Sequence, residues 1–236
     1  MKTVRMDINR LITDVARFQD DLFRNIKGIR ESQSLYDDLA LDEGDLAVAF
    51  AVEIATKPYS SSPLITRPFD YGTIVSHPFV QANWTGTRFS AGTLYGVWYG
   101  AQHLETTVYE TVYHWRRFIM DSYPNEDRVI PGERRVCKVA CLGVLIDLVG
   151  KEEEFPGLVD PSDYSFCQMV GKNLWDMKQQ GLLARSARCY GVNVAIFTPD
   201  VLSDPRDYCY LTYKWNPAAG GPVTVERNVG EVWMMV

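Results

Sequence analysis

Residues 84–110 constrain the fold of this chain more than any other stretch. A glycine-rich turn at residues 86–92 precedes an apolar run, residues 94–99, that is typical of a buried strand. Residues 102–120 then place apolar side chains at helical spacing, which predicts an amphipathic helix. Glu110 lies about 135° from the middle of that apolar stripe on a helical wheel. It is therefore expected outside the core, either in solvent or at the edge of a cleft.

The rest of the main domain alternates strand patterns with one further helix. Strands are predicted over residues 135–148 and 192–197, and residues 208–215 and 223–227 predict a closing hairpin. Residues 166–177 predict an amphipathic helix that is ended by Gly181. This irregular order favours an α+β fold over a doubly wound sheet. No G-x-G-x-x-G motif opens a helix after a strand, which argues against a Rossmann dinucleotide site.

The beginning of the chain predicts a helical leader. Apolar residues recur there at spacings of three and four, at Ile8, Leu11, Val15, Phe18, Leu22 and Ile26. Residues 46–52 predict a second short helix. We therefore expect a helical N-terminal extension over residues 1–58 and a main domain over residues 59–236. The extension either packs on the main domain or serves as a detachable arm for a partner.

Composition limits the classes of function. The net charge of −6 argues against a general nucleic-acid binder, which is usually basic. The chain has no run of eighteen apolar residues and no signal-peptide pattern, so a cytoplasmic protein without a membrane span is expected. Five cysteines lack the pairing of a disulfide scaffold and the spacing of a metal site. They are interpreted as structural thiols, and no metal is expected.

Two separate stretches carry the residue types of a single binding site. Arg88 and Tyr99 lie in the first stretch with Glu110, and Ser186 and Arg188 lie in the second, at residues 185–193. These types suit a pocket that binds a diphosphate, stacks a flat ring and stabilises a developing cation. That is the chemistry of cleaving a nicotinamide dinucleotide at its glycosidic bond.

Five segments in order resemble the RES domain family, which is named for its arginine, glutamate and serine. They are residues 66–69, 86–92, 98–101 with Glu110, 164–175 and 186–197, within a resemblance that covers residues 63–202. The family implies an ADP-ribosyltransferase-like fold, in which helices surround a mixed β core. It also implies NAD consumption, either by degradation or by ADP-ribosylation of a protein. RES domains are commonly the toxin of a bacterial toxin–antitoxin pair, whose antitoxin is an Xre-like helix-turn-helix protein.

The resemblance also implies roles for individual residues. The expected catalytic residues are Glu110, Arg88 and Ser186, with Glu110 stabilising an oxocarbenium-like ribose. The expected NAD-binding residues are Arg67, Arg88, Tyr99, Ser186 and Arg188. The arginines suit the diphosphate because the guanidinium binds phosphate oxygens in a bidentate way, and Tyr99 is expected to stack on the nicotinamide.

Several alternatives stay open from the sequence. NAD is expected as a substrate, and the acceptor is water, phosphate or a protein side chain. DNA contact is assigned to the antitoxin, and a homo-oligomer is not decided. A catalytically silent interaction protein with the same fold is a further alternative. A Ser–His–Asp hydrolase built on Ser186 is disfavoured, since His77, His103 and His114 show no paired spacing.

Overall fold

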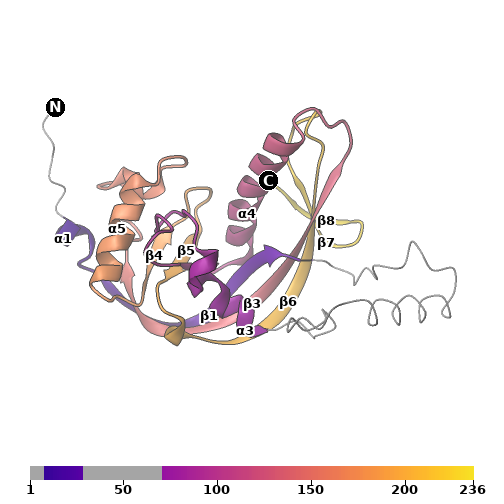
Figure 1. The fold of residues 1–236 in the computed structure, drawn as a ribbon. Helices are drawn as coiled ribbons and strands as arrows, with labels where there is room; N and C mark the ends of the chain where they lie inside the picture. Colours follow the sequence, from indigo (N-terminus) through magenta and orange to yellow (C-terminus); the bar gives the residue numbers. More distant parts are fainter. Residues whose placement is uncertain (1–7, 29–70) are drawn as a thin grey trace, which may run out of the picture.

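The computed structural model describes residues 8–28 and 71–236, which form an eight-stranded mixed sheet with helices packed against it (Figure 1). The strands are β1 (Val15–Lys27), β2 (Trp98–Ala101), β3 (Ile130–Asp147), β4 (Gly181–Arg185), β5 (Val192–Ile196), β6 (Leu202–Trp215), β7 (Thr224–Asn228) and β8 (Glu231–Met235). The helices are α1 (Ile8–Leu11), α3 (Tyr71–Ser76), α4 (Leu104–Ser122) and α5 (Ser165–Asp176). Short 3-10 turns lie at His77–Phe79, Gln81–Asn83, Pro156–Val159 and Pro199–Val201. The predicted α+β class is confirmed.

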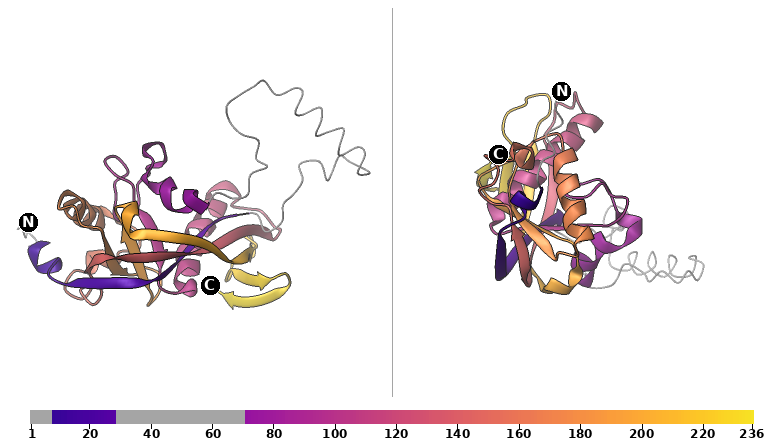
Figure 2. Two further views of the ribbon diagram at one scale, coloured as in Figure 1. Left: turned by 90° about the horizontal axis from the view of Figure 1, so that it is seen from below. Right: turned by 90° about the vertical axis from the view of Figure 1, so that its left-hand side faces the viewer.

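In one half of the sheet, the strand pairings form a closed ring. The strands lie in the order β1-β2-β5-β4-β3-β6-β7-β8, and β1 also pairs with β3 along its whole length. Neighbours are antiparallel except β3 and β4, which are parallel. Figure 2 shows β1, β3 and β6 as the long strands, with the β7–β8 hairpin at one end of the molecule. The short strands β2, β5 and β4 therefore connect one edge of β1 back to β3.

Helix α4 carries the apolar stripe that the sequence predicts. Leu104, Val108, Val112 and Ile119 are buried along it and belong to one core cluster with side chains of β6 and β7. This burial follows the spacing of three and four residues that aligns side chains on one helix face. Because the stripe occupies the core side, Glu110 lies on the flank of the helix and is half-buried.

The N-terminal segment corrects a prediction. Residues 15–27 form strand β1, although their apolar spacing predicts a helix, and only Ile8–Leu11 is helical. Phe18 and Leu22 are buried, and a spacing of four places two side chains on one face of a strand as well as of a helix. Long-range pairing of all thirteen β1 residues with β3 decides between the two.

The correction also changes the expected domain organisation. Residues 15–27 belong to the main sheet and not to a helical extension over residues 1–58. The helix predicted over residues 46–52 and the boundary at residue 58 lie outside the described residues.

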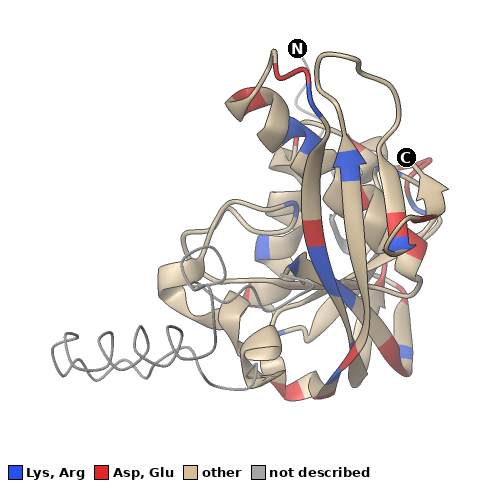
Figure 3. Ribbon diagram, turned by 90° about the vertical axis from the view of Figure 1, so that its right-hand side faces the viewer, with Lys and Arg blue, Asp and Glu red and all other residues tan. Residues whose placement is uncertain are grey.

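Helix length and surface charge bear on two further expectations, one about a membrane span and one about nucleic-acid binding. None of the helices that the structure describes is both long and apolar enough to cross a membrane. On the side drawn in Figure 3, basic and acidic segments are interspersed along the long strands. Ion pairs such as Arg135 with Asp207 and Arg206 with Asp21 join different strands. This side therefore carries mixed charge, whereas nucleic-acid binding uses a continuous basic surface.

Candidate functional site

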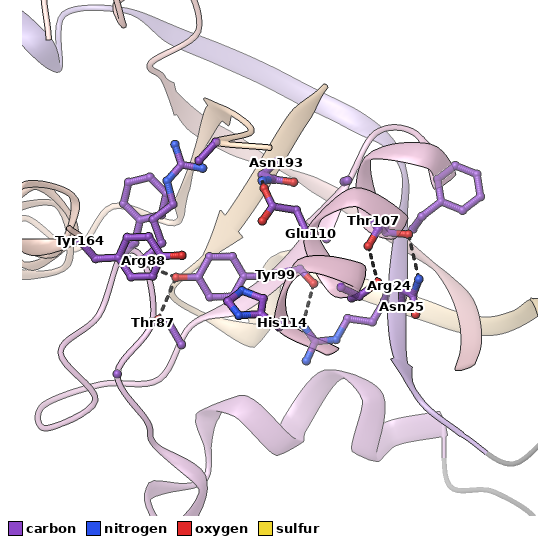
Figure 4. A pocket seen from close by; sticks show the side chains of 17 residues that line it. Arg24, Asn25, Thr87, Arg88, Tyr99, Thr107, Glu110, His114, Tyr164 and Asn193 are labelled. Atoms are coloured by element: carbon purple, nitrogen blue, oxygen red, sulfur yellow. Dashed lines mark hydrogen bonds between the residues drawn. The ribbon is translucent and has the colours of Figure 1, made fainter. Parts of the chain in front are cut away.

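A pocket of about 260 Å3 lies where α4 meets the inner strands and the glycine-rich turn (Figure 4). Two sides of it come from segments that are far apart in the sequence, β1 and α4. Its polar lining residues are Arg24, Asn25, Thr87, Arg88, Tyr99, Thr107, Glu110, Thr111, His114, Tyr164 and Asn193. The strand pairings of β1, β2 and β5 bring these residues together.

Glu110 is the carboxylate of this pocket. Its Oε1 accepts a hydrogen bond from Ser186 Oγ at 2.6 Å and another from Asn193 Nδ2 at 2.5 Å. No hydrogen bond from the described residues reaches its second oxygen, Oε2. The two donors fix the orientation of the carboxylate, and Oε2 remains for a ligand. Of the two locations that the helical wheel allowed, the structure selects the edge of a cleft.

Ser186 holds Glu110 from a nearly enclosed position. The residue is only 4% exposed, and its Oγ accepts hydrogen bonds from the backbone N–H groups of Arg188 and Cys189 at 3.0 and 3.3 Å. A serine hydroxyl has a single proton, and here that proton is donated to Glu110. The geometry therefore fits a residue that orients the carboxylate.

The turn that carries Arg88 is fixed by Tyr99. The Thr87 N–H donates to the Ser90 carbonyl oxygen at 2.7 Å, which closes the turn. The Tyr99 hydroxyl bonds Thr87 Oγ1 at 2.9 Å and accepts from the Phe89 N–H at 2.9 Å. Burial raises the pKa of Tyr99, so the hydroxyl stays protonated. Tyr99 lines the pocket with its ring while its hydroxyl positions the turn.

Helix α5 supports the same turn from the other side. Gln168 donates from Nε2 to the Thr87 carbonyl oxygen at 3.0 Å. Gly171 permits the close approach, because a Cβ at this position would lie 2.0 Å from the Phe89 carbonyl oxygen. The backbone beside Arg88 is thus held by β2 and α5 together.

Arg88 is buried with part of its guanidinium unpaired. The residue is only 9% exposed, and Nη2 donates to the carbonyl oxygens of Leu158 and Arg185, the latter at 2.8 Å. Its Nε and Nη1 have no hydrogen-bond partner among the described residues. Leaving a buried polar group unpaired costs roughly 1–3 kcal/mol. An anion in the pocket would supply the missing acceptors.

Arg24 provides a second cation at the pocket, one that the sequence pattern does not single out. It comes from β1, lies 5.1 Å from the centroid of the Trp98 ring and donates from Nη1 to the Tyr99 carbonyl oxygen at 2.6 Å. Its Nε is buried without a partner among the described residues. Burial, together with the positive charge of Arg134, lowers the pKa of Arg24 to about 10. In Figure 4, Arg24 and Arg88 lie on opposite sides of the Tyr99 ring.

The unpaired nitrogens concentrate at this site. Among the described residues, four buried side-chain nitrogens lack a hydrogen-bond partner: three belong to Arg24 and Arg88, which line the pocket, and one belongs to Arg188, which does not. Buried polar groups in native proteins are nearly always paired, and the exceptions mark strained or functional sites. The pocket therefore offers unpaired donors to which a ligand could bind.

A neighbouring set of polar side chains is fully paired. Asn25 donates to Tyr213 Oη at 2.9 Å and to Thr107 Oγ1 at 3.3 Å, and Tyr213 Oη also pairs with Thr111 Oγ1 at 2.7 Å. Arg134 donates from Nε to Asn25 Oδ1 at 2.9 Å and from Nη2 to the Asn25 carbonyl oxygen at 3.2 Å. This set, which we term the strut, joins β1 to α4, β3 and β6.

Two of the predicted NAD-binding residues, Ser186 and Arg188, do not line the pocket. Arg188 is absent from the lining of the pocket, and its guanidinium lies 3.4 Å from the centroid of the Tyr113 ring. It also donates from Nη2 to the Pro161 carbonyl oxygen and to Tyr164 Oη, at 2.6 and 3.1 Å. Arg188 thus ties the loop after β4 to α4 and to the loop before α5. Arg67 lies outside the described residues.

The structure adds residues that the sequence did not single out. Asn193 is the last residue of the second stretch, residues 185–193, and its polar side chain within an otherwise apolar strand was the available signal. Arg24 and Asn25 carried no usable signal, because their segment predicts a helix. The described residues contain no group of three or more His, Cys, Asp or Glu side chains that could hold a metal ion.

The fold and the pocket define an α+β protein whose site combines two buried arginines with an oriented carboxylate. A family model described as the RES domain matches residues 64–216, well over half of the sequence. The chain belongs to the RES domain family. The matched region begins after β1, so Arg24 and Asn25 lie outside it.

The chain was also compared with curated proteins and with solved structures. The search of curated proteins finds no match to this chain. Among solved structures, the fold is similar to the crystal structure of the M. tuberculosis MbcT–MbcA toxin–antitoxin complex, with a TM-score of 0.45 and 14% sequence identity. The similarity covers 87% of this chain and 88% of that chain.

Proposed function

We propose that this protein is the toxin of a toxin–antitoxin pair and that it consumes NAD by cleaving the bond between nicotinamide and ribose. Membership of the RES domain family supports the role as a toxin. The observation that carries the proposed chemistry is the pocket itself, where partly unpaired guanidinium groups of Arg88 and Arg24 line the same space as the Glu110 carboxylate.

Arginine suits the diphosphate of NAD. The guanidinium is planar, stays charged and binds phosphate oxygens through two parallel hydrogen bonds. Arg88 keeps Nε and Nη1 available, and Arg24 keeps Nε available. The negative charge of a diphosphate would also offset the repulsion that Arg24 experiences from Arg134.

Glu110 suits the reaction at the ribose. The nicotinamide group leaves as a neutral molecule, so the bond breaks without a strong general acid. Positive charge then develops on the ribose, and a preoriented carboxylate stabilises such a cation. The hydrogen bonds from Ser186 and Asn193 hold Glu110 in place before the reaction, which avoids reorganisation during it. In this proposal Glu110 and Arg88 contact NAD, and Ser186 is a positioning residue.

Control of such an enzyme requires a partner. A protein that drains NAD harms its own cytoplasm, and the resemblance to RES domains points to an Xre-like helix-turn-helix antitoxin. A structural neighbour of this fold is the toxin–antitoxin complex named above. We propose that the antitoxin covers the pocket, with a carboxylate that pairs with the arginines. Co-expression with the neighbouring gene product is expected to restore growth, and high NAD should compete with the partner.

Product identification after incubation with labelled NAD tests the proposal. Release of nicotinamide with a soluble ADP-ribosyl product supports NAD degradation by the purified chain. Label on protein instead indicates an ADP-ribosyltransferase, which uses the same pocket. Absence of NAD loss, together with an unchanged melting temperature in the presence of NAD, indicates a catalytically silent interaction protein.

A further inference from the structure

His114 occupies the pocket beside Glu110 and has no role in the chemistry described so far. It lies on α4 four residues after Glu110, and both side chains line the same pocket. Residues four apart on a helix have Cβ atoms about 5–6 Å apart, so the two groups reach one small volume. Figure 4 shows the imidazole in front of the Tyr99 ring, on the side of the pocket that also holds Arg24.

The imidazole of His114 is accessible and uncommitted. The residue is exposed to solvent, and among the described residues neither ring nitrogen makes a hydrogen bond. Its ring packs edge-on against Tyr113, with 5.2 Å between the ring centroids. The other two histidines of the chain lie away from the pocket. His77 bonds Asn83, and His103 is an exposed residue that precedes α4.

The groups around His114 favour its neutral form. Burial of part of the ring lowers its pKa below the ordinary value, the positive charges of Arg188 and Arg117 lower it further, and Glu110 raises it. The charged and titratable groups around the imidazole come from the helix itself, the loop after β4, β1 and β2: Glu110, Tyr113, Arg117, Arg188, Arg24 and Tyr99. At neutral pH the side chain is therefore a free base.

We propose that His114 is the general base that activates a water molecule as the acceptor, an assignment that rests on the proposed NAD cleavage. The water oxygen forms the new bond to C1′ of the ribose, and the proton of the water passes to the imidazole. The C1′–N bond breaks, and its electron pair leaves with neutral nicotinamide. His114 then releases the proton to solvent, so one NAD and one water give ADP-ribose, nicotinamide and one proton.

Glu110 and His114 have different roles in this step, and the difference follows from their chemistry. Glu110 is oriented by two hydrogen bonds and keeps its negative charge for the ribosyl cation. An imidazole has the proton affinity of an efficient base near neutral pH, and a neutral ring does not repel the developing cation. An acceptor that carries no proton has no need of His114.

Steady-state kinetics of the full-length chain with the variant His114→Gln test this assignment, with His103→Gln as the matched control. We expect kcat of His114→Gln to fall by about 10²-fold with KM nearly unchanged. The wild-type kcat should rise with pH through one titration at acid pH and then level off, whereas the variant loses that titration. Azide, an anionic nucleophile without a proton, should restore turnover of the variant and form ADP-ribosyl azide.

Each other outcome overturns the assignment. Normal kcat and an unchanged pH profile in His114→Gln exclude a base at this position. A slow variant that azide does not rescue indicates a structural role, and His114→Asn provides a second check of that result. ADP-ribose 1″-phosphate as the main product in phosphate buffer also overturns it, because a phosphate dianion needs no base. No NAD loss by the wild type overturns the proposed function together with this role, so the two failures are distinguishable.

Discussion

Two sets of buried polar side chains meet at the pocket, and they differ in how completely they are paired. The strut of Asn25, Thr107, Thr111, Tyr213 and Arg134 satisfies its hydrogen bonds within the protein. Arg24 precedes Asn25 on β1 and Arg88 lies on the glycine-rich turn, and both keep buried N–H groups without acceptors among the described residues. The comparison separates groups that the fold itself pairs, some of which also line the pocket, from cations that a ligand would pair in our proposal.

Asn25 and Arg24 show the contrast between adjacent residues. They are consecutive on β1, so their side chains leave opposite faces of the strand backbone. Asn25 bonds three side chains of the strut, and Arg24 reaches Trp98 and the Tyr99 carbonyl oxygen. Both residues line the pocket, but the side chain of Asn25 is engaged in the strut, whereas Arg24 binds substrate in our proposal.

The largest effect is expected from removing the negative charge of Glu110, which hydrogen bonds from Ser186 and Asn193 orient. Glu110→Gln keeps the shape of the side chain and should lower kcat for NAD by about 10²-fold or more, the typical loss for one preorganised electrostatic group. NAD affinity, measured by calorimetry, should change little. Turnover close to the wild-type rate in this variant would remove Glu110 from the mechanism.

The second-largest effect is expected at Arg88, the partly unpaired cation on the glycine-rich turn. Arg88→Ala should weaken NAD binding by roughly 10–100-fold, since charge-assisted hydrogen bonds contribute about 1.5–3 kcal/mol. Arg88→Lys should also weaken it, because lysine lacks the bidentate fork. The exposed Arg128, which pairs with Glu126, supplies a control in Arg128→Lys. Equal NAD affinity for Arg88→Ala and the wild type would show that the diphosphate binds elsewhere.

A pair of substitutions compares the two buried arginines directly. Arg134→Met leaves Asn25 Oδ1 without its donor, so the free energy of unfolding should fall by about 1–3 kcal/mol. Arg24→Met removes a buried charge with an unpaired Nε, so the loss of stability should be smaller while NAD affinity falls. Urea denaturation and calorimetry measure the two quantities. The reverse ranking of stability would mean that Arg24 is the structural cation.

The smallest effect is expected within the strut. Tyr213→Phe removes a buried hydroxyl that pairs with Asn25 and Thr111, and it should cost about 1 kcal/mol of unfolding free energy. NAD affinity should not change, since Tyr213 does not line the pocket. A loss of NAD affinity without a loss of unfolding free energy would instead show that the strut contributes to NAD binding.

Local pattern predicted much of this molecule because the physics there is local. The apolar stripe of α4 and the helix α5 follow from side-chain spacing, and the hairpin of β6 and β7 follows from alternation around a glycine-rich loop. The same stripe excluded Glu110 from the core, which is why its place at a cleft edge was among the alternatives. The order of motifs also predicted the family, since a motif is carried by the chain itself.

The tertiary structure alone decided what β1 is and what the pocket contains. A spacing of four suits both a helix and a strand, so Phe18 and Leu22 could not choose between them, and pairing with the distant strand β3 did. That choice brings Arg24 and Asn25 beside residues more than seventy positions away. The same holds for the engaged hydroxyl of Ser186 and the stacking of Arg188 on Tyr113. The sequence by itself determined the residue types and the local elements, and long-range packing determined which side chains stay unpaired.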